Sequence, residues 1–363
     1  MQEAIAAALE KKDFRTAATL LQQWQRKDPK TPLLRFMIGQ YQEATERWEL
    51  AEKTYLKLLR QATSQKLMGQ ARQGIQRVQA KITQAREAAL ATARTQPDSQ
   101  EPGLLCLEPV QAEHRKTAAQ GLAKVMQIDP YTAGLQLPSK GWRLHRVGSV
   151  GEMKFYSQAL VEAQTPAFWV KQSDVNGIQV FRIDYVRQMQ PQIEVVCKNP
   201  EGQLGVIAFA WTEVSQIVLG QLPLFESVVD TDAWRNLQRK EKTQDYAEIL
   251  DLHLHRRGCV LRLCDRTYDF RQSNPFPHGE TIPDQALSTR PHWNAVTTYI
   301  RKQVQAPNHQ GFAQFGEGAL EYLELLPTLT SHIDIPRPQP TNWDPAFHLY
   351  SSLHFLRFGS STL

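Results

Sequence analysis

The chain contains 363 residues, of which 41% are hydrophobic, and its formal net charge is +5. This length predicts two or three domains with sizeable cores. No stretch approaches the roughly 20 apolar residues of a membrane-spanning helix, and the start lacks the basic and then apolar pattern of a signal peptide. The 4 cysteines are too scattered for a disulfide framework, so we expect a soluble protein in the reducing cytoplasm.

Two segments near the N terminus match at an interval of 34 residues, which indicates a helical repeat. The matched pairs are Phe14 and Trp48, Ala17 and Ala51, and Leu21 and Tyr55. The pattern resembles the tetratricopeptide repeat (TPR), in which two antiparallel helices cross closely at a Gly and a small Ala while an aromatic ring fills the adjacent space. Gly39 and Tyr55 stand at the Gly and aromatic positions of the second unit, whereas the first unit has Ile5 and Leu21 there. An ordinary helical hairpin bundle is the alternative.

Residues 65–95 are predicted to form a long helix that caps the repeats and packs on the second unit. Its apolar residues recur at helical spacing and form one stripe: Met68, Ala71, Ile75, Val78, Ile82, Ala85 and Ala89. Residues 1–96 contain 17 Lys and Arg against 9 Asp and Glu, so this segment carries a net charge of +8. The capping helix contributes much of that excess.

The resemblance to TPR proteins implies a groove lined by the first helix of each unit, and a basic groove would select a helix or an acidic peptide segment of a protein partner. The predicted partner-binding residues are Phe36, Gln40, Arg72, Arg77, Lys81 and Arg86. Two alternatives stay open: the basic surface rests on an anionic membrane face, or it is only solvated. Nucleic acid is not expected, because the basic residues lack interleaved exposed aromatics.

Residues 97–103 form a polar, proline-containing linker, and residues 104–173 are predicted to form a small domain with the order β-α-α-β-α-β. Within it, Asp129 is expected as an N-cap and Pro130 as the first residue of a short helix. Over residues 104–172 this order resembles the C-terminal domain of the bacterial ribosomal stalk protein and the related Clp protease adaptor fold. The resemblance implies a docking module without catalytic residues. Factor binding is not implied, since residues 129–134 lack the Gly-rich and Lys-rich turn of the stalk domain.

Residues 174–363 are predicted to form an antiparallel β-meander with one solvent-exposed face, followed by helices. Strands are expected around residues 181–185, 193–197, 207–211, 249–255 and 259–264, and helices at 293–303, 312–325 and 347–358. The basic run 235–242 is expected to be a solvated loop or short helix, with contact to headgroups or an acidic partner as the functional alternative. The fold class is thus multidomain, α plus α+β, and a pleckstrin-like half-barrel stays open for this last domain.

The strongest enzyme signal in the chain is a group of His and Cys residues that fall within twelve positions: His253, His255, Cys259 and Cys264. Imidazole and thiolate are zinc ligands, but no Cys-x-x-Cys pair occurs, and Cys259 and Cys264 would project to opposite faces of a strand. The loop 275–280 contains a His and an acid without further support for catalysis. Since no phosphate-binding, nucleophile or zinc-protease motif occurs either, we expect no enzyme activity, no cofactor and no bound metal.

Segments 128–132, 137–144 and 342–351 resemble a TPR family of cyanobacterial type that has no assigned chemistry. In that setting the resemblance implies assembly of a photosynthetic complex. The leading hypothesis is therefore a non-catalytic adaptor or scaffold that binds a protein partner through the basic TPR groove. A peripheral factor on anionic membranes and a metal-dependent enzyme in the C-terminal domain are the alternatives. The sequence does not predict the oligomeric state.

Overall fold

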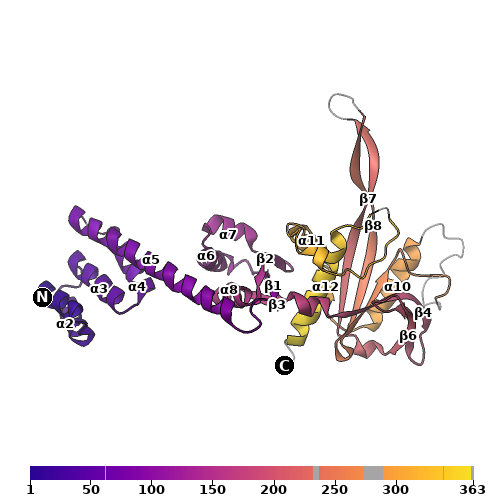
Figure 1. Ribbon diagram of the computed structural model, residues 1–363, viewed down its shortest axis with the longest axis horizontal. Helices are drawn as coiled ribbons and strands as arrows, with labels where there is room; N and C mark the ends of the chain where they lie inside the picture. Colours follow the sequence, from indigo (N-terminus) through magenta and orange to yellow (C-terminus); the bar gives the residue numbers. More distant parts are fainter. Residues whose placement is uncertain (62, 232–236, 274–288, 338, 361–363) are drawn as a thin grey trace. The chain divides into compact units, whose positions relative to one another are not determined.

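The computed structural model describes residues 1–61, 63–231, 237–273, 289–337 and 339–360. The chain divides into two compact units, Met1–Thr95 and Gln96–Leu363. Figure 1 colours the chain from indigo at the N terminus to yellow at the C terminus. The first unit is helical, and the second combines helices with two sheets. No helix in the described ranges is both long and apolar enough to cross a membrane.

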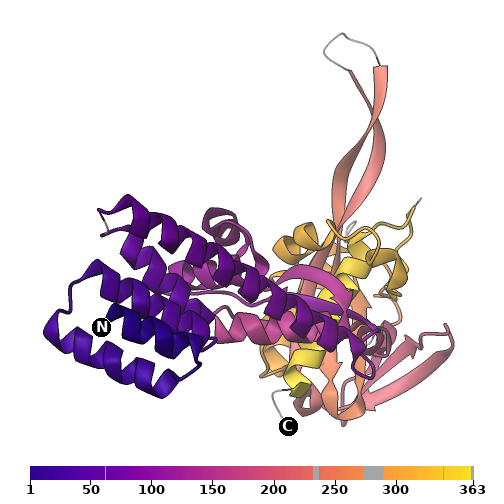
Figure 2. The ribbon, with the colours of Figure 1, turned by 60° about the vertical axis from the view of Figure 1, so that its left-hand side comes forward.

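The first unit is a stack of antiparallel helices (Figure 2). Its helices are α1 (Gln2–Glu10), α2 (Phe14–Lys27), α3 (Pro32–Ala44), α4 (Trp48–Leu59) and α5 (Gln65–Thr95). Asp13 caps α2 by accepting a hydrogen bond from the backbone N–H of Thr16 at 3.1 Å, and Pro32 opens α3 at a position where no N–H is needed. The helices α1 with α2 and α3 with α4 form the two expected hairpins, and α5 packs on α3 and α4.

The ring of Tyr55 on α4 fits between two glycines. A Cβ atom at Gly39 on α3 would lie 2.4 Å from this ring, and a Cβ atom at Gly74 on α5 would lie 2.7 Å from it. In the first hairpin, Ile5 and Leu21 hold the equivalent positions, and both are buried. The larger Ile in place of Gly compensates for the smaller Leu in place of Tyr, so the two hairpins fill similar space with different residues.

The helix α5 is longer than the surface it packs against. Ala71, Gly74 and Val78 are buried, whereas the last two residues of the predicted apolar stripe, Ala85 and Ala89, are exposed. The stripe therefore describes the packed face of α5 only as far as about Ile82, which is half-buried.

The second unit begins with the β-α-α-β-α-β order that the sequence predicts. Its elements are β1 (Pro102–Leu107), α6 (Arg115–Met126), α7 (Pro130–Gln136), β2 (Arg143–Ser149), α8 (Val150–Glu162) and β3 (Ala167–Lys171). The three strands form an antiparallel sheet of order β2-β1-β3, and Asp129 caps α7 as predicted. The expected linker is shorter than 97–103, because β1 already begins at Pro102 and Ser99 is buried.

A larger sheet of seven strands follows, with the order β10-β7-β8-β9-β4-β5-β6. Its strands are β4 (Gln179–Gln188), β5 (Ile193–Lys198), β6 (Leu204–Phe209), β7 (Gln216–Thr231), β8 (Leu237–Leu254), β9 (Cys259–Cys264) and β10 (Asn308–His309). The expected purely antiparallel meander is wrong, since β4 pairs with β9 and β10 pairs with β7 in parallel. The expected solvent-exposed face is also wrong for β9, which is buried along its whole length.

Helices cover both faces of the large sheet. On one face, α10 (Arg290–Gln303) packs through Trp293, Val296 and Ile300. On the other face lie α11 (Phe312–Ala319) and α12 (Trp343–Ser360). The short elements are α9 (Gln172–Asn176) and the 3-10 turns Trp211–Glu213, His255–Arg257 and Leu326–Thr328. The helix expected over 312–325 thus ends at Ala319, and its remaining residues form turns.

The two sheets share one hydrophobic core around α12. This core joins residues of β1, β2 and β3, such as Leu104, Leu144 and Phe168, with residues of β7 and α12, such as Val218 and Phe347. A helix that is buried on all sides must have packing partners all round it. The segments 104–173 and 174–363, which we expected to be separate domains, therefore form a single compact unit.

The strands β7 and β8 extend well beyond their neighbours and form a two-stranded ribbon (Figure 1). Pairing with β9 involves only Ile249–Leu254 of β8, and pairing with β10 involves only Ile217 and Val218 of β7. Residues 237–242 of the basic run lie in this ribbon, so the expected loop or short helix is wrong there; residues 235 and 236 lie outside the described residues. Pairing with β7 overrides a local composition that shows no strand pattern.

We predict opposite effects for two Gly-to-Ala substitutions on α5. Gly74→Ala should destabilise the helical unit by about 1–3 kcal/mol, because the new methyl group overlaps the Tyr55 ring. Gly69→Ala, on the same helix but with no neighbour within 4 Å, should stabilise it by about 0.5–1 kcal/mol through helix propensity. Urea unfolding followed by far-UV circular dichroism measures both, and equal stabilisation by the two variants would contradict the packing of Tyr55.

Candidate functional site

The two residues expected to line the groove of the helical unit have different surroundings. Phe36 is only 6% exposed, and its ring centroid lies 5.9 Å from that of Tyr55. Its assignment as a partner-binding residue is therefore wrong, because the ring belongs to the core. Gln40, one turn further along α3, is half-buried and keeps part of its surface available for contact.

Arg77 is an internal link between α5 and α3. Its Nε and Nη2 donate to Oε1 and Oε2 of Glu43 at 2.7 and 3.0 Å, and the Tyr55 hydroxyl donates to Glu43 Oε2 at 2.9 Å. Burial, followed by the Glu43 charge, raises the pKa of Tyr55, so the hydroxyl stays protonated and acts as the donor. Arg77 therefore links α5 to α3, and the carboxylate of Glu43 neutralises its charge.

The basic residues of α5 lie on two flanks of the helix. Gln79 hydrogen-bonds to Glu52 of α4, whereas Arg77 pairs with Glu43 of α3, so one flank adjoins each neighbouring helix. Arg72 and Lys81 are nine positions apart, which on a helix of 3.6 residues per turn corresponds to a rotation of about 180°. Lys81 therefore lies with Arg77 on the α3 flank, and Arg72 lies on the opposite flank.

The basic residues of α5 that are predicted to bind a partner do not all lie on one flank of the helix. Both Arg72 and Lys81 are exposed, and Lys81 also donates to Gln84 Oε1 at 3.3 Å. Arg86 is half-buried and lies near the Arg72 flank. Of the six predicted residues, Gln40, Arg77 and Lys81 thus share one side of the helical unit. Arg77 and Lys81 are both exposed cations there, but Arg77 is paired with Glu43.

The structure does not bring His253, His255, Cys259 and Cys264 together. Cys259 belongs to the core on the α10 side of the sheet, and Cys264 belongs to the core on the α12 side. Burial raises the pKa of both thiols, that of Cys264 to about 11, so neither is a ready thiolate ligand. Over the described residues, no group of three or more His, Cys, Asp and Glu has the geometry to hold a metal ion.

A buried ion pair joins β8 and β9 under α12. Arg262 donates through Nε and Nη2 to the two carboxylate oxygens of Asp251 at 2.8 and 2.7 Å, and both side chains are almost completely buried. Ser351 of α12 donates to Asp251 Oδ2 at 2.6 Å and lies 3.0 Å from His253 Nε2. Because the Ser351 proton is directed to Asp251, His253 Nε2–H donates to the hydroxyl oxygen.

This group has the residue types of a hydrolytic triad in the wrong order. A nucleophilic serine needs a histidine between itself and the carboxylate, so that the imidazole can take the hydroxyl proton. Here Ser351 lies between Asp251 and His253, and the group is closed to solvent. Burial also lowers the pKa of His253 well below its usual value and keeps the ring neutral. The arrangement positions α12 and does not activate Ser351.

Three aromatic rings stack at the edge of the large sheet. The His354 ring lies between Trp142 and His309, with centroid separations of 4.0 and 3.9 Å. Gln216 joins them, since its Oε1 lies 2.8 Å from His309 Nε2 and its Nε2 donates to the His354 carbonyl at 3.1 Å. Sequence reasoning missed this group, because its members are far apart in the chain and stand in no recognisable motif.

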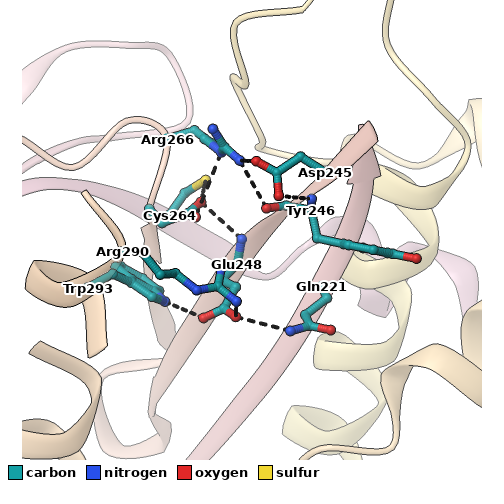
Figure 3. Close-up of polar contacts among 9 residues, drawn as sticks. Gln221, Asp245, Tyr246, Glu248, Cys264, Arg266, Arg290 and Trp293 are labelled. Atoms are coloured by element: carbon teal, nitrogen blue, oxygen red, sulfur yellow. Dashed lines mark hydrogen bonds and ion pairs between the residues drawn. The ribbon is translucent and has the colours of Figure 1, made fainter. Parts of the chain in front are cut away.

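Glu248 is the centre of a polar network at the base of the β7–β8 ribbon. Figure 3 shows Gln221, Arg290 and Trp293 converging on its carboxylate, with donor distances of 3.0, 2.7 and 2.6 Å. Its backbone N–H also donates to Asp265 Oδ1 at 2.9 Å, and burial raises the pKa of Asp265. The network ties α10 to the ribbon.

The loop 275–280, with its His and acid, lies outside the described residues.

The described surface of the second unit contains two notable cavities. The smaller one, about 140 Å³, is lined by the cations Arg182, Lys198 and Arg262, which are direct neighbours across strands β4, β5 and β9. Each of these cations meets a carboxylate, so the cavity has little net charge. The larger one, about 270 Å³, lies between α11 and the segment from α7 to β2.

Comparison with protein-family models, with curated protein sequences and with solved structures finds no match to this chain. The interpretation of its function therefore rests on its own residues.

The buried histidines predict acid sensitivity of the second unit. Burial, followed by His309, lowers the pKa of His354 to about 2. Between that value and the unfolded pKa of about 6.5, only the unfolded chain binds the proton, so stability falls as the pH drops, by up to about 1.4 kcal/mol per pH unit. His354→Phe keeps a ring in the stack and removes this contribution, so the variant should lose less stability between about pH 7 and 4.5. Urea unfolding followed by Trp fluorescence at each pH measures the difference, and parallel curves would contradict a buried, neutral His354.

Proposed function

We propose that the chain is a non-catalytic adaptor that binds a protein partner through the side of the helical unit where α3 and α5 lie next to each other. The observation that carries the proposal is the position of the Tyr55 ring between Gly39 and Gly74. Close approach of helices at Gly, with an aromatic ring between them, is how TPR hairpins stack into an array with a binding groove. A place in the assembly of a larger complex is compatible with such a role.

The charged residues of this side favour an acidic partner segment. Lys81 is exposed there, and Gln40 provides a neutral hydrogen-bonding group on the neighbouring helix. Arg77 keeps Glu43 neutralised, so this carboxylate does not repel an acidic ligand. We therefore expect a partner segment that contains Asp or Glu, with packing in the groove contributing more to its affinity than ion pairs.

A pair of matched variants tests the proposal with the full chain. Lys81→Glu reverses a charge on the α3 flank of α5, and Arg72→Glu makes the same change on the opposite flank. Tagged chains are used to recover crosslinked proteins from native cells, with quantification by mass spectrometry. Lys81→Glu should reduce recovery of at least one protein about fivefold, the effect of removing and reversing an exposed ion pair worth about 1 kcal/mol. Arg72→Glu should leave that recovery unchanged.

Identical recovery by the unsubstituted chain and by both variants would contradict a binding surface on the α3 flank. The membrane alternative predicts a different result, since an anionic surface attracts cations on either flank. Salt-sensitive co-sedimentation with anionic vesicles that falls equally in both variants would support peripheral membrane binding instead.

A further inference from the structure

The larger cavity of the second unit has an apolar wall and an acidic wall. Leu135 near the end of α7, Pro138 just after α7 and Trp142 before β2 form the apolar wall. Glu317 and Glu321, on and after α11, stand on the acidic wall. Both walls belong to the same compact unit, so their relative position is fixed by the core around α12.

Three hydrogen-bond acceptors line this cavity without a short contact to a donor among the described residues: Glu317, Glu321 and Gln136 Oε1. The Glu317 side chain makes no hydrogen bond or ion pair within the part of the chain that the structure describes. The Glu321 side chain, which is 66% exposed, makes one long contact of 3.8 Å with Arg143 Nη2 among the described residues. Gln136 Oε1 is buried without a hydrogen-bond donor from the described residues, and Gln136 also lines the cavity. A buried acceptor without a donor is costly, so the cavity fits a ligand that supplies donors and positive charge.

The size and the apolar wall restrict the ligand further. A volume of about 270 Å³ lies below the range of about 300–1,000 Å³ that is typical of sites for whole drug-sized molecules. The Trp142 ring is already stacked on His354 on one side, at 4.0 Å, and is only partly buried, so it offers a rigid aromatic surface. Such a surface favours a flat cation that stacks, and it favours guanidinium over a compact ammonium group.

We propose that this cavity binds the side chain of an arginine on a partner protein. The guanidinium donates to Glu317 and Glu321, a further N–H meets Gln136 Oε1, and the aliphatic part of the side chain lies along Leu135 and Pro138. Exposed apolar residues beside the cavity, Leu135 at 64% and Tyr131 at 77%, provide contact area for the peptide that carries the arginine. Without the ligand, Arg143 makes a loose contact with Glu321, and its guanidinium competes with that of the ligand for this carboxylate.

All residues of the site belong to the second unit, and its test uses the full chain with small probes. The probe is N-acetyl-arginine amide, and N-acetyl-citrulline amide is its neutral control of the same shape. Titrations are followed by ligand-observed NMR. The arginine probe should bind at least about tenfold more tightly than the citrulline probe, because charge-assisted hydrogen bonds to carboxylates are about twice as strong as neutral ones. N-acetyl-lysine amide should bind more weakly than the arginine probe.

Four variants identify the residues responsible. Glu317→Gln and Glu321→Gln should each weaken arginine binding at least about fivefold, whereas Arg143→Gln should strengthen it by removing the competing guanidinium. Glu324→Gln, an exposed carboxylate a few residues further on that does not line the cavity, should have no effect. Equal binding of arginine and citrulline, or an equal loss in Glu324→Gln, would overturn the proposal. Lys81→Glu should leave this binding unchanged, so failure here and failure of the adaptor role in the helical unit are distinguishable.

Discussion

The second unit depends on the buried pair of Asp251 and Arg262. Removing two charges from water is expensive, and such a pair stabilises a fold only when its remaining hydrogen bonds are satisfied. Here the Ser351 hydroxyl of α12 supplies one of them, and the Ser331 carbonyl accepts from Arg262 Nη1 at 2.5 Å. Loss of either charged partner would leave an unpaired charge in the core, at a cost of about 3–5 kcal/mol. The pair therefore fixes the register of α12 on the large sheet.

The position of α12 in turn determines the rest of the unit. Its other side contacts the small sheet, where His354 stacks on Trp142 and Arg357 pairs with Glu108 at 3.0 Å. Since Trp142 also lines the larger cavity, the same helix supports the wall of the proposed arginine site. The polar residues of α12 thus have a structural explanation, and the sites that remain for binding partners are surfaces supported by that core.

Local sequence patterns predicted the elements that depend on neighbours in the chain. The spacing of Gly39, Ala51 and Tyr55 predicted the helical hairpin, and Asp129 with Pro130 predicted the start of α7. The patterns did not predict the parallel pairing of β4 with β9, because the choice of strand partner depends on contacts across about 80 residues. They also missed the β7–β8 ribbon. Residues 240–246 of its strand β8 are all exposed, so they show no alternating apolar pattern.

The candidate sites show the same division between local and long-range information. The sequence of α5 shows that the helix is rich in basic residues. The flank on which each of them lies follows only from the helix periodicity together with the contact between Arg77 and Glu43, which places Lys81 and Arg72 on opposite flanks. The resemblance to TPR proteins placed Phe36 in the groove, but its side chain packs against the Tyr55 ring in the core. Glu317 and Leu135 are nearly two hundred positions apart, so no local motif could place them on opposite walls of one cavity.

Native-state hydrogen exchange of the full chain, resolved by mass spectrometry at low urea concentrations, shows directly whether α12 joins both sheets into one body. If it does, amides of β1, β2 and β3 should open with the same free energy as those of β8, β9 and α12, while the helical unit opens separately. A cooperative opening of residues 102–171 at lower free energy, with β8 and α12 still protected, would contradict it.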